Sequence, residues 1–416
     1  MVTVIGLGFV GLTTSLGLSE LGYPVYGFDA NSERLNSLKN KKLDFAEPDL
    51  EDQLRKHYNN SFFLDRSLAE AIQKSSFIFV CVGSPCNQDG SVDLRQVIGA
   101  VNQCLKCVPK DGIHRTIVIK STVPPGTCKD VVEPIVRNCG YCDKELSVAS
   151  NPEFLREGSC WNDFMKPGRI VIGADNQDSL NGLKTMYCSL DAPVHCVSPS
   201  CAEFSKYLSN IMLASMISFA NELAHAAKMF GNIDVISAFE TLRNDERLKN
   251  SGIASYLYPG CGYGGYCLPK DISAFTAALN QRGYNSDFLN AVISVNDRVA
   301  DRFCDEVAAV AAVTETIGIL GLAFKPGTDD VRDTAAARLI CGLQKKGYTS
   351  IVAYDPQALV TFQKYYPDLN VIYVKTSSEV LEQAKTIVIA TAWDEFRFLD
   401  YTDKNLIDGR YMIKER

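Results

Sequence analysis

Histidine is scarce in this 416-residue sequence, which also lacks long apolar runs and an excess of positive charge. The four histidines, His57, His114, His195 and His225, are not at metal-ligand spacing, so we expect no metal site and no chemistry built on a histidine base. No apolar run reaches the roughly 18 residues of a membrane-spanning helix. The net charge of -7 argues against nucleic-acid binding, which needs a basic face.

A secretory signal and a disulfide framework are also missing. The start of the chain has no basic n-region and no cleavage site, so we expect no signal peptide. The 15 cysteines are odd in number and scattered. Two Cys-x-x-Cys pairs occur, at Cys104/Cys107 and Cys139/Cys142, but the first lies in a helix-like stretch and the pairs are too far apart for a zinc ribbon. We therefore expect reduced thiols in a soluble, cytoplasmic protein without membrane association.

Apolar runs alternate with helix-like segments in the first half of the chain. A strand at 2–5, a glycine turn, a helix to Leu21 and a second strand at 25–28 are predicted in turn. Further apolar runs, bounded by turn signals, occur at 77–82, 116–120, 146–149 and 170–172. This alternation predicts a parallel α/β sheet, and the chain length indicates two or three domains.

The pattern changes at Ser198, a predicted helix N-cap that is followed by Pro199. From Cys201 to Phe230 there is no glycine or proline, which predicts a helix about 45 Å long at roughly 1.5 Å per residue. Helical patterns continue to about Val310. A weak repeat then follows, because the sequence at 319–324, ILGLAF, resembles VIGLGF at the start of the chain.

The repeat again leads into a helix, a Gly-Tyr stop and a strand that ends in Asp355, but it lacks two of the three glycines. We infer a second doubly wound domain that does not hold a dinucleotide in the usual way. The predicted fold is therefore α/β, with two Rossmann-like domains joined by a long central helix and a small helical domain. The predicted boundaries are 1–197, 198–310 and 311–416.

Gly6, Gly8 and Gly11 match the G-x-G-x-x-G pattern, with a predicted strand before it and a predicted helix after it. Such glycines allow a tight turn and let pyrophosphate approach the helix N-terminus. Asp29, 23 residues after Gly6, ends the second strand, where a carboxylate accepts hydrogen bonds from the ribose and repels a 2′-phosphate. This context favours an NAD site over an accidental glycine-rich turn.

Two further pairs of polar residues are four positions apart. Glu153 and Glu157 lie in a segment past a strand end and share one face if that segment is helical; taken alone, they also fit a solvated surface. Lys206 and Asn210 interrupt an apolar face of the long helix and need partners if they are buried. They could equally be a structural polar pair.

The segment from Gly260 to Asp271 carries the strongest chemical signal. Four glycines within six residues can let backbone N–H groups line an anion or carbonyl site. Cys267 ends that loop, and Lys270 is the kind of neighbour that lowers the pKa of a thiol. A thiolate can add to an aldehyde, and the resulting thiohemiacetal can give up a second hydride.

Together these segments resemble the UDP-glucose/GDP-mannose dehydrogenase family over the whole length of the chain. The matching blocks, in the order of the family, are GLGFVGL (6–12), KSTVPPGT (120–127), NPEFLREG (151–158) with DF…P…RIVIG (163–173), AEFSKYLSN (202–210), GYGGYCLPKD (262–271) and LAFKPGTDDVRDT (322–334). The resemblance implies a homodimer that oxidises the C6 primary alcohol of a nucleotide sugar to a carboxylate with two NAD⁺ per turnover.

The resemblance also implies roles for individual residues. Cys267 is the implied nucleophile, and Lys206, Asn210 and Asp271 would hold and polarise the oxidised oxygen and a water. Glu157 and Thr122, with Glu153 nearby, would position water for thioester hydrolysis. The implied NAD-binding residues are Gly6, Gly8, Phe9, Val10, Gly11, Asp29, Arg34, Val82, Gly83, Ser84, Ser121, Thr122, Glu157, Lys270 and Arg332. The implied substrate-binding residues are Glu153, Phe154, Leu155, Arg156, Lys206, Asn210, Arg247, Tyr256, Tyr258, Gly260, Gly264, Phe324 and Lys325, with Arg247 supplied across the dimer interface and the long helix as the core of that interface.

The nucleotide sugar itself stays open among UDP-glucose, GDP-mannose and another UDP-hexose. The segment NPEFLREG resembles the UDP-glucose branch of the family, so UDP-glucose is the expected substrate. The 20 positions from Arg247 to Cys267 and the stretch 256–260 resemble the GDP-mannose enzymes instead. A two-electron dehydrogenase would not need Cys267, and a non-catalytic sensor would be expected to lose Cys267, Lys206 or Asp271, so both are disfavoured.

Overall fold

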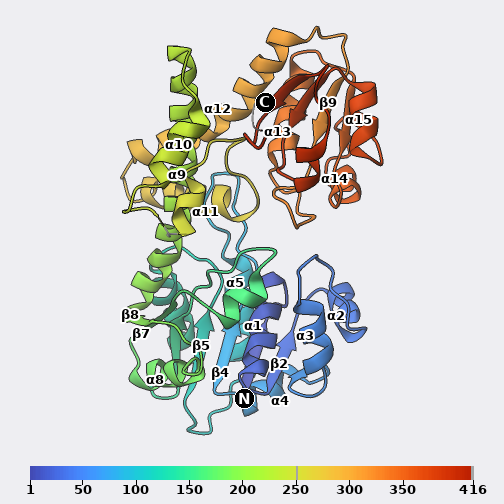
Figure 1. Ribbon diagram of the computed structural model, residues 1–416. Coiled ribbons are helices and arrows are strands. Elements are labelled where there is room, and N and C mark those ends of the chain that lie inside the picture. Colours follow the sequence, from blue (N-terminus) through green and yellow to red (C-terminus); the bar gives the residue numbers. More distant parts are fainter. Residues whose placement is uncertain (250–251, 414–416) are drawn as a thin grey trace. The chain divides into compact units, whose positions relative to one another are not determined.

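The computed structural model describes residues 1–249 and 252–413, and the chain divides into two units at Leu208/Ser209. Each unit contains one open sheet (Figure 1). The fold is α/β, with two Rossmann-like sheets and a long helix between them in the chain, as predicted. The predicted three-domain boundaries stay a prediction.

The sheet of the first unit has eight strands in the order β3-β2-β1-β4-β5-β6-β7-β8. Its strands are β1 (Val2–Ile5), β2 (Val25–Phe28), β3 (Phe62–Phe63), β4 (Phe77–Val80), β5 (Arg115–Ile119), β6 (Leu146–Ser150), β7 (Ile170–Ala174) and β8 (Val194–Val197). The strand order reverses between β1 and β4, which is the switch point where open α/β sheets bind ligands.

Helices cover both faces of this sheet because side chains alternate along each strand. On one face, Val2 and Val4 pack with α1 (Phe9–Glu20), α2 (Ser32–Lys39), α3 (Leu50–His57), α7 (Cys160–Met165) and α8 (Gln177–Met186). On the other face, Ile5 and Ile78 pack with α4 (Leu68–Lys74), α5 (Arg95–Leu105), the π-helical turn η1 (Cys128–Val132) and α6 (Glu133–Asn138).

One strand of this sheet departs from the prediction. The apolar run at 170–172 forms β7 as expected, but β7 is antiparallel to β6 through Ala149↔Ala174 and Ser150↔Gly173. The connection from β6, residues 151–169, contains only the six-residue α7. The sheet is therefore mixed rather than wholly parallel.

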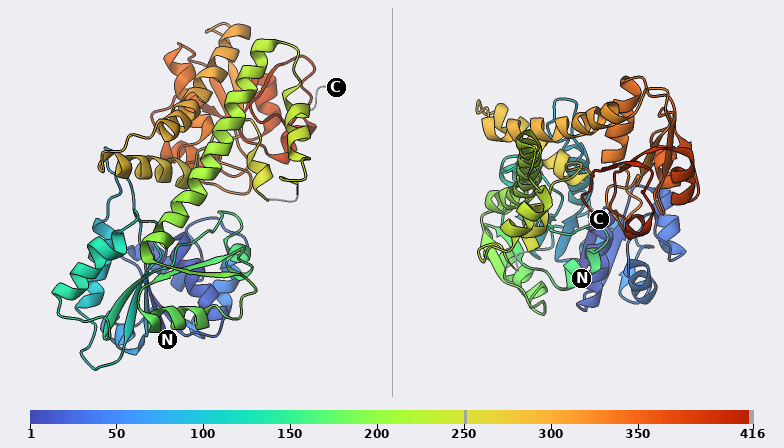
Figure 2. Two further views of the ribbon diagram at one scale, coloured as in Figure 1. Left: turned by 90° about the vertical axis from the view of Figure 1, so that its left-hand side faces the viewer. Right: turned by 45° about the horizontal axis from the view of Figure 1, so that its top comes forward.

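The helix α9 (Pro199–Phe230) is continuous for 32 residues, as its lack of internal glycine and proline predicted (Figure 2). Ser198 accepts a hydrogen bond from the N–H of Cys201 at 3.3 Å, which fits an N-cap. The boundary between the two units falls within this helix.

The second unit contains α10 (Val235–Arg243), the 3₁₀ turn η2 (Gly252–Tyr256), α11 (Cys267–Asn280) and α12 (Asp287–Val310). A five-stranded parallel sheet follows, in the order β11-β10-β9-β12-β13. Its strands are β9 (Ile317–Leu320), β10 (Ile351–Tyr354), β11 (Ile372–Tyr373), β12 (Thr386–Ile389) and β13 (Asn405–Asp408). This order repeats that of the first five strands of the other sheet.

The second sheet is also covered on both faces. Ile317 and Ile319 pack with α12, α13 (Ala335–Lys345) and α14 (Leu359–Tyr365), whereas Leu320 packs with α15 (Ser377–Gln383) and the 3₁₀ turn η3 (Asp394–Phe398). Both sheets are thus doubly wound, which puts ligand-binding loops at the carboxyl ends of the strands.

All 15 cysteines are thiols rather than disulfides in the structure. Within the described part of the chain, no helix combines the length and apolar character needed to cross a membrane.

Candidate active site

The predicted glycine turn lies at the switch point of the first sheet. Gly6 has φ +90°, and a Cβ there would lie 2.9 Å from the backbone of Cys81 and Val82, which follow β4. A Cβ on Gly11 would lie 1.7 Å from the carbonyl oxygen of Gly6, so only glycine fits at that position. Gly8 is the N-cap of α1 and brings no side chain to the helix N-terminus. These features leave the backbone open to a phosphate.

Asp29 follows β2 and lies beside this turn. Its carboxylate accepts hydrogen bonds from the N–H of Leu7 at 2.6 Å and of Asn31 at 2.8 Å. Arg34 Nη1 lies 3.6 Å from Asp29, but Arg34 Nε donates to Asp44 at 2.9 Å. The residues therefore fit the adenosine end of NAD, with a carboxylate placed for ribose hydroxyls.

Two further predicted NAD segments lie at adjacent strand ends. Ser121 Oγ donates to the carbonyl oxygen of Val82 at 2.6 Å, and Ser84 Oγ donates to that of Thr122 at 2.7 Å. These bonds join the loop after β4 to the loop after β5. The structure thus brings the residues predicted at 82–84 and 121–122 together with the glycine turn.

Glu153 and Lys206 form a buried ion pair in the first unit. Lys206 Nζ lies 2.9 Å from Glu153 Oε1, and the two side chains are only 5% and 8% exposed. Burial alone would raise the pKa of Glu153, but the charge and hydrogen bond of Lys206 hold it below its ordinary value. Glu153 also accepts the N–H of Leu155 at 2.6 Å. Glu153 is thus not part of a solvated surface, and neither Glu153 nor Lys206 is a buried charge without a partner.

The segment that carries Glu153 is not helical, so Glu153 and Glu157 do not share a helix face. Glu153 is buried, whereas Glu157 is half-buried. Proline at position 152 disfavours helical geometry at Asn151, and the backbone hydrogen bonds go to side chains instead. The backbone N–H of Arg156, for example, donates to Asp163 Oδ2 at 2.9 Å.

Neighbouring side chains fix this segment. The guanidinium of Arg169 stacks on the ring of Phe154 at 3.9 Å. Glu47, from the loop before α3, accepts the N–H of Gly158 at 2.8 Å and of Cys160 at 2.7 Å. Leu155 is partly buried and packs against the core beneath the sheet.

Cys267 is the first residue of α11 in the second unit, and it is exposed. The N-terminus of a helix carries a partial positive charge, which favours the thiolate form of a cysteine. Lys270 lies in the same first turn and pairs with Asp271 at 2.6 Å. Burial alone would lower the pKa of Lys270, but Asp271 raises it, with a smaller contribution from Cys267. The lysine therefore stays charged near the thiol.

Asp271 also links α11 to α9. Asn210 Nδ2 donates to Asp271 Oδ2 at 2.6 Å, and both side chains are buried. Asp271 thus accepts from Lys270 on one oxygen and from Asn210 on the other. Three residues predicted for the site meet in this chain of hydrogen bonds.

The glycine-rich loop before Cys267 is held by two asparagines that were not predicted. Asn221 Oδ1 accepts the N–H of Gly260 at 2.8 Å. Asn296, which is 2% exposed, accepts the N–H of Tyr263 at 2.7 Å and donates to its carbonyl oxygen at 3.0 Å. The available signal was the position of Asn296 within the apolar stripe of α12.

The loop also contacts residues predicted for the ligands. A Cβ on Gly264 would lie 2.2 Å from the carbonyl oxygen of Asp333, and one on Gly265 would lie 2.9 Å from the ring of Phe324. The guanidinium of Arg332 lies 4.6 Å above the ring of Tyr266. Phe324 and Arg332 therefore lie against the loop that ends in Cys267.

The remaining predicted residues are placed as follows. The hydroxyl of Tyr258 donates to the carbonyl oxygen of Tyr411 at 2.8 Å. Tyr256 is the last residue of η2 and is partly buried. Lys325 is partly exposed next to Phe324. The side chain of Arg247 is 87% exposed and pairs with the nearby Asp245.

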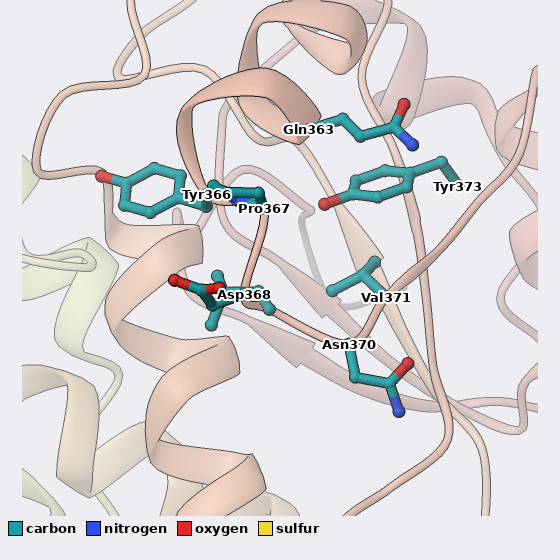
Figure 3. A pocket seen from close by; sticks show the side chains of 8 residues that line it. Gln363, Tyr366, Pro367, Asp368, Asn370, Val371 and Tyr373 are labelled. Carbon is teal, nitrogen blue, oxygen red and sulfur yellow. The ribbon is translucent and has the colours of Figure 1, made fainter.

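A cavity of about 320 Å³ lies elsewhere in the second unit, at the turn between α14 and β11 (Figure 3). The residues that line it are Gln363, Tyr366, Pro367, Asp368, Leu369, Asn370, Val371 and Tyr373. None of them is a predicted site residue. The figure shows the side chains of Gln363 and Asn370 turned away from its centre.

The comparison with family models decides the family. Models of the NAD-binding, central and UDP-binding domains of the UDP-glucose/GDP-mannose dehydrogenase family match residues 1–191, 200–298 and 318–415. The chain belongs to the UDP-glucose/GDP-mannose dehydrogenase family. It is therefore an NAD-dependent dehydrogenase, and the predicted cofactor NAD is confirmed.

Individual relatives agree with this family assignment. A UDP-glucose 6-dehydrogenase of Haloferax volcanii is 33% identical over 100% of this chain and 97% of its own length. The structure of a UDP-glucose dehydrogenase from Pyrobaculum islandicum matches with a TM-score of 0.92 and 37% identity, over 99% of this chain and 94% of that one. A GDP-mannose dehydrogenase from Pseudomonas aeruginosa matches with a TM-score of 0.58 and 28% identity, over 100% and 97% of the two chains.

The second Rossmann-like domain of this dehydrogenase carries a carboxylate at the position that Asp29 has in the first. Asp355 follows β10 and accepts hydrogen bonds from the backbone N–H groups of residues 322, 323, 357 and 358 and from Trp393 Nε1. Asp355 is only 2% exposed. Its hydrogen-bonding capacity is thus used within the protein, which agrees with the inference that this domain does not hold a dinucleotide in the usual way.

Proposed function

We propose that this dehydrogenase oxidises the C6 primary alcohol of UDP-glucose to the carboxylate of UDP-glucuronate, with Cys267 as a covalent nucleophile. The observation that carries the proposal is the position of Cys267 at the first residue of α11, exposed, with Lys270 in the same helical turn. A two-electron alcohol dehydrogenase has no use for such a thiol, whereas the oxidation of an aldehyde to an acid does.

Two NAD⁺, bound one after the other at the glycine turn of Gly6, Gly8 and Gly11, would each supply a two-electron oxidation. After the first oxidation, the Sγ of Cys267 adds to the aldehyde carbon and forms a thiohemiacetal. Loss of the second hydride from the thiohemiacetal leaves a thioester. Water then adds to the thioester carbonyl, the C–S bond breaks, and the thiolate of Cys267 is restored. Because the aldehyde is captured as it forms, we expect no aldehyde in solution.

The oxygen at C6 gains negative charge when the first hydride leaves and again when water attacks the thioester. We propose that Lys206, Asn210 and Asp271 hold this oxygen and a water. The Lys206 cation and the Asn210 amide N–H can stabilise the oxyanion, whereas the Asp271 carboxylate can accept a hydrogen bond from the water. We assign the positioning of the hydrolytic water to Glu153, Glu157 and Thr122. The buried Lys206–Glu153 pair supports these roles, since a paired lysine stays charged when buried.

We also propose the binding sites as predicted. NAD binding is assigned to Gly6, Gly8, Phe9, Val10, Gly11, Asp29, Arg34, Val82, Gly83, Ser84, Ser121, Thr122, Glu157, Lys270 and Arg332. Sugar-nucleotide binding is assigned to Glu153, Phe154, Leu155, Arg156, Lys206, Asn210, Arg247, Tyr256, Tyr258, Gly260, Gly264, Phe324 and Lys325. In domain terms, we assign NAD to 1–197, dimerisation and catalysis to 198–310, and the sugar nucleotide to 311–416.

A homodimer is proposed on the surface of α9. Seven of its exposed side chains are large and apolar, and six of these recur at intervals of four or seven residues: Phe204, Leu208, Met212, Phe219, Leu223 and Phe230. Such a stripe along one helix fits a self-complementary interface. The 15 reduced thiols support a reducing compartment, and we place the protein in the cytoplasm.

GDP-mannose is the second candidate substrate, favoured by the stretch 256–260 and by the 20 positions between Arg247 and Cys267. One assay separates the candidates: NADH release with UDP-glucose, UDP-galactose, UDP-N-acetylglucosamine and GDP-mannose, each at matched concentration. We expect the highest kcat/KM with UDP-glucose and two NADH for each sugar consumed. One NADH per sugar would contradict the four-electron reaction, and a preference for GDP-mannose would replace the substrate.

A further inference from the structure

Lys120 is a buried lysine to which neither the predictions nor the proposed mechanism gives a role. It directly follows β5 and is 5% exposed. Its Nζ donates to the side-chain oxygen of Asn151 at 3.0 Å and to the carbonyl oxygen of Asn151 at 3.3 Å. Both contacts fall on the residue that follows β6, two positions before Glu153.

Asn151 is held from two other sides as well. Tyr187 donates its hydroxyl to the side-chain oxygen of Asn151 at 2.7 Å, and Asn151 Nδ2 donates to the carbonyl oxygen of Val171 at 2.8 Å. Lys120, Tyr187 and Asn151 are all buried. The start of the turn that carries Glu153 is thereby fixed, and only Lys120 among these partners brings a charge.

The charged and titratable groups that face Lys120 are Cys81, Glu153 and Lys206. Burial lowers the pKa of Lys120, and Cys81 and Glu153 act in the opposite direction. Cys81 is buried, and burial raises the pKa of its thiol to about 12, so it is neutral at physiological pH. Among the groups named here, Glu153 is thus the anion near Lys120, and it already pairs with Lys206 at 2.9 Å.

We propose that Lys120 is a positioning residue for Glu153: it fixes the turn through Asn151 and places a second positive charge near the carboxylate. This inference rests on the proposed function, in which Glu153 helps to orient the water that hydrolyses the thioester. In that step the water oxygen bonds to the carbonyl carbon, the C–S bond to Cys267 breaks with its electron pair on sulfur, and one water proton passes to Glu153. A carboxylate can accept this proton only while it is ionised.

The test compares Lys120→Met with wild-type enzyme and with Tyr187→Phe, which also removes a hydrogen bond to Asn151 but removes no charge. Rapid mixing with NAD⁺ and UDP-glucose follows NADH, and acid-quenched samples are weighed by intact-protein mass spectrometry. We expect Lys120→Met to release a burst of close to two NADH per site and then turn over at least about tenfold more slowly, with a covalent sugar adduct on the protein. Tyr187→Phe should show a smaller loss and no adduct.

The pH profile supplies a second readout. Lys120 is one of the groups that lower the pKa of Glu153, although burial raises it and Lys206 contributes more. Removing Lys120 should therefore move the acid limb of the steady-state rate to higher pH, whereas Tyr187→Phe should leave it in place. A purely structural contact would not move this limb.

Two outcomes are decisive. A Lys120→Met enzyme without burst or adduct and with an unmoved acid limb overturns the inference. Wild-type enzyme that releases no NADH with any of the four nucleotide sugars overturns the proposed function instead. NAD⁺ binding and thermal unfolding check that each variant is folded, and Lys120→Gln, which keeps a hydrogen-bond donor, replaces Lys120→Met if that variant does not fold. Lys120→Gln should show the same burst and adduct, because it too lacks the charge.

Discussion

Replacing Lys206 by methionine should destabilise the protein in a pH-dependent way. The substitution keeps an apolar stem but leaves the carboxylate of Glu153, 8% exposed, without its ion-pair partner at 2.9 Å. Breaking a buried pair by removing one partner costs about 3–5 kcal/mol. We expect the lower end of this range, about 3 kcal/mol at pH 8. The reason is that two favourable interactions of Glu153 remain in the variant. Its carboxylate still accepts a hydrogen bond from the N–H of Leu155 at 2.6 Å, and the positive charge of Lys120 still stabilises it.

The sign of the pH dependence follows from the pKa of Glu153. In the wild-type protein Lys206 holds this pKa below its ordinary value, so the pair contributes stability above the unfolded pKa and loses it as the pH falls through the folded one. Without Lys206, burial dominates and raises the pKa of Glu153. The carboxyl then takes up a proton at higher pH, and the difference in stability between variant and wild type should shrink from pH 8 towards pH 5.5.

Urea unfolding at both pH values measures this difference, and the fluorescence of Trp161, in the same unit, reports on it. Lys206→Met/Glu153→Gln is the matched control, because it removes both charges and should regain most of the lost stability. Both variants should lose about 10²–10³-fold in kcat with little change in KM, since each lacks the proposed oxyanion donor. An equal deficit at pH 8 and pH 5.5, or a double variant as unstable as the single one, would refute the reasoning.

Two further predictions concern the nucleophile and the cofactor. Cys267→Ser should abolish acid formation while NAD⁺ binding, measured by titration calorimetry, stays intact; turnover at a tenth or more of the wild-type rate, roughly 1.4 kcal/mol in barrier, would contradict the covalent mechanism. NAD⁺ should be preferred over NADP⁺ by at least about a hundredfold in kcat/KM, or about 2.7 kcal/mol, because Asp29 would face the 2′-phosphate. Asp29→Gly should reduce that preference, and equal use of both cofactors by the wild-type enzyme would show that Asp29 is misassigned.

Local patterns predicted most of the fold. The strands at 2–5 and 25–28 were predicted at their observed bounds, because each is an apolar run closed by a turn signal. The helix at 199–230 followed from the absence of glycine and proline. The direction of β7 was not predictable in this way, because the hydrophobic pattern of an apolar strand does not show whether the neighbouring strand is parallel or antiparallel to it.

The sequence singled out candidate site residues, whose roles stay predictions, but it did not predict the contacts between them. Periodicity shows that Lys206 and Asn210 share a helix face, yet it does not show that one pairs with Glu153 and the other with Asp271. Such partners are 53 and 61 positions away in the sequence, and only the tertiary fold brings them together. Lys120 was missed for the same reason, although it opens one of the motifs.

The two strand-end carboxylates differ in how far the protein itself uses their capacity to accept hydrogen bonds. Asp29 accepts two backbone N–H groups and keeps 10% of its side chain exposed beside the glycine turn. Asp355 accepts four backbone N–H groups and the indole of Trp393. The first carboxylate can therefore still meet a ribose, whereas the second ties the loops after β9 and β12 to β10.

Asp355→Ala should consequently destabilise the second Rossmann-like domain, whereas Asp29→Ala should mainly weaken NAD⁺ binding. Each buried N–H group that loses its acceptor costs about 1–3 kcal/mol. The losses are not additive, because water can enter the space that the carboxylate leaves, so we expect a total of about 3 kcal/mol or more for five donors. Urea unfolding followed by fluorescence measures this loss, with Trp393 as a local probe. Comparable instability of the two variants, or a stable Asp355→Ala protein with weakened NAD⁺ binding, would mean that the second carboxylate has kept the role of the first.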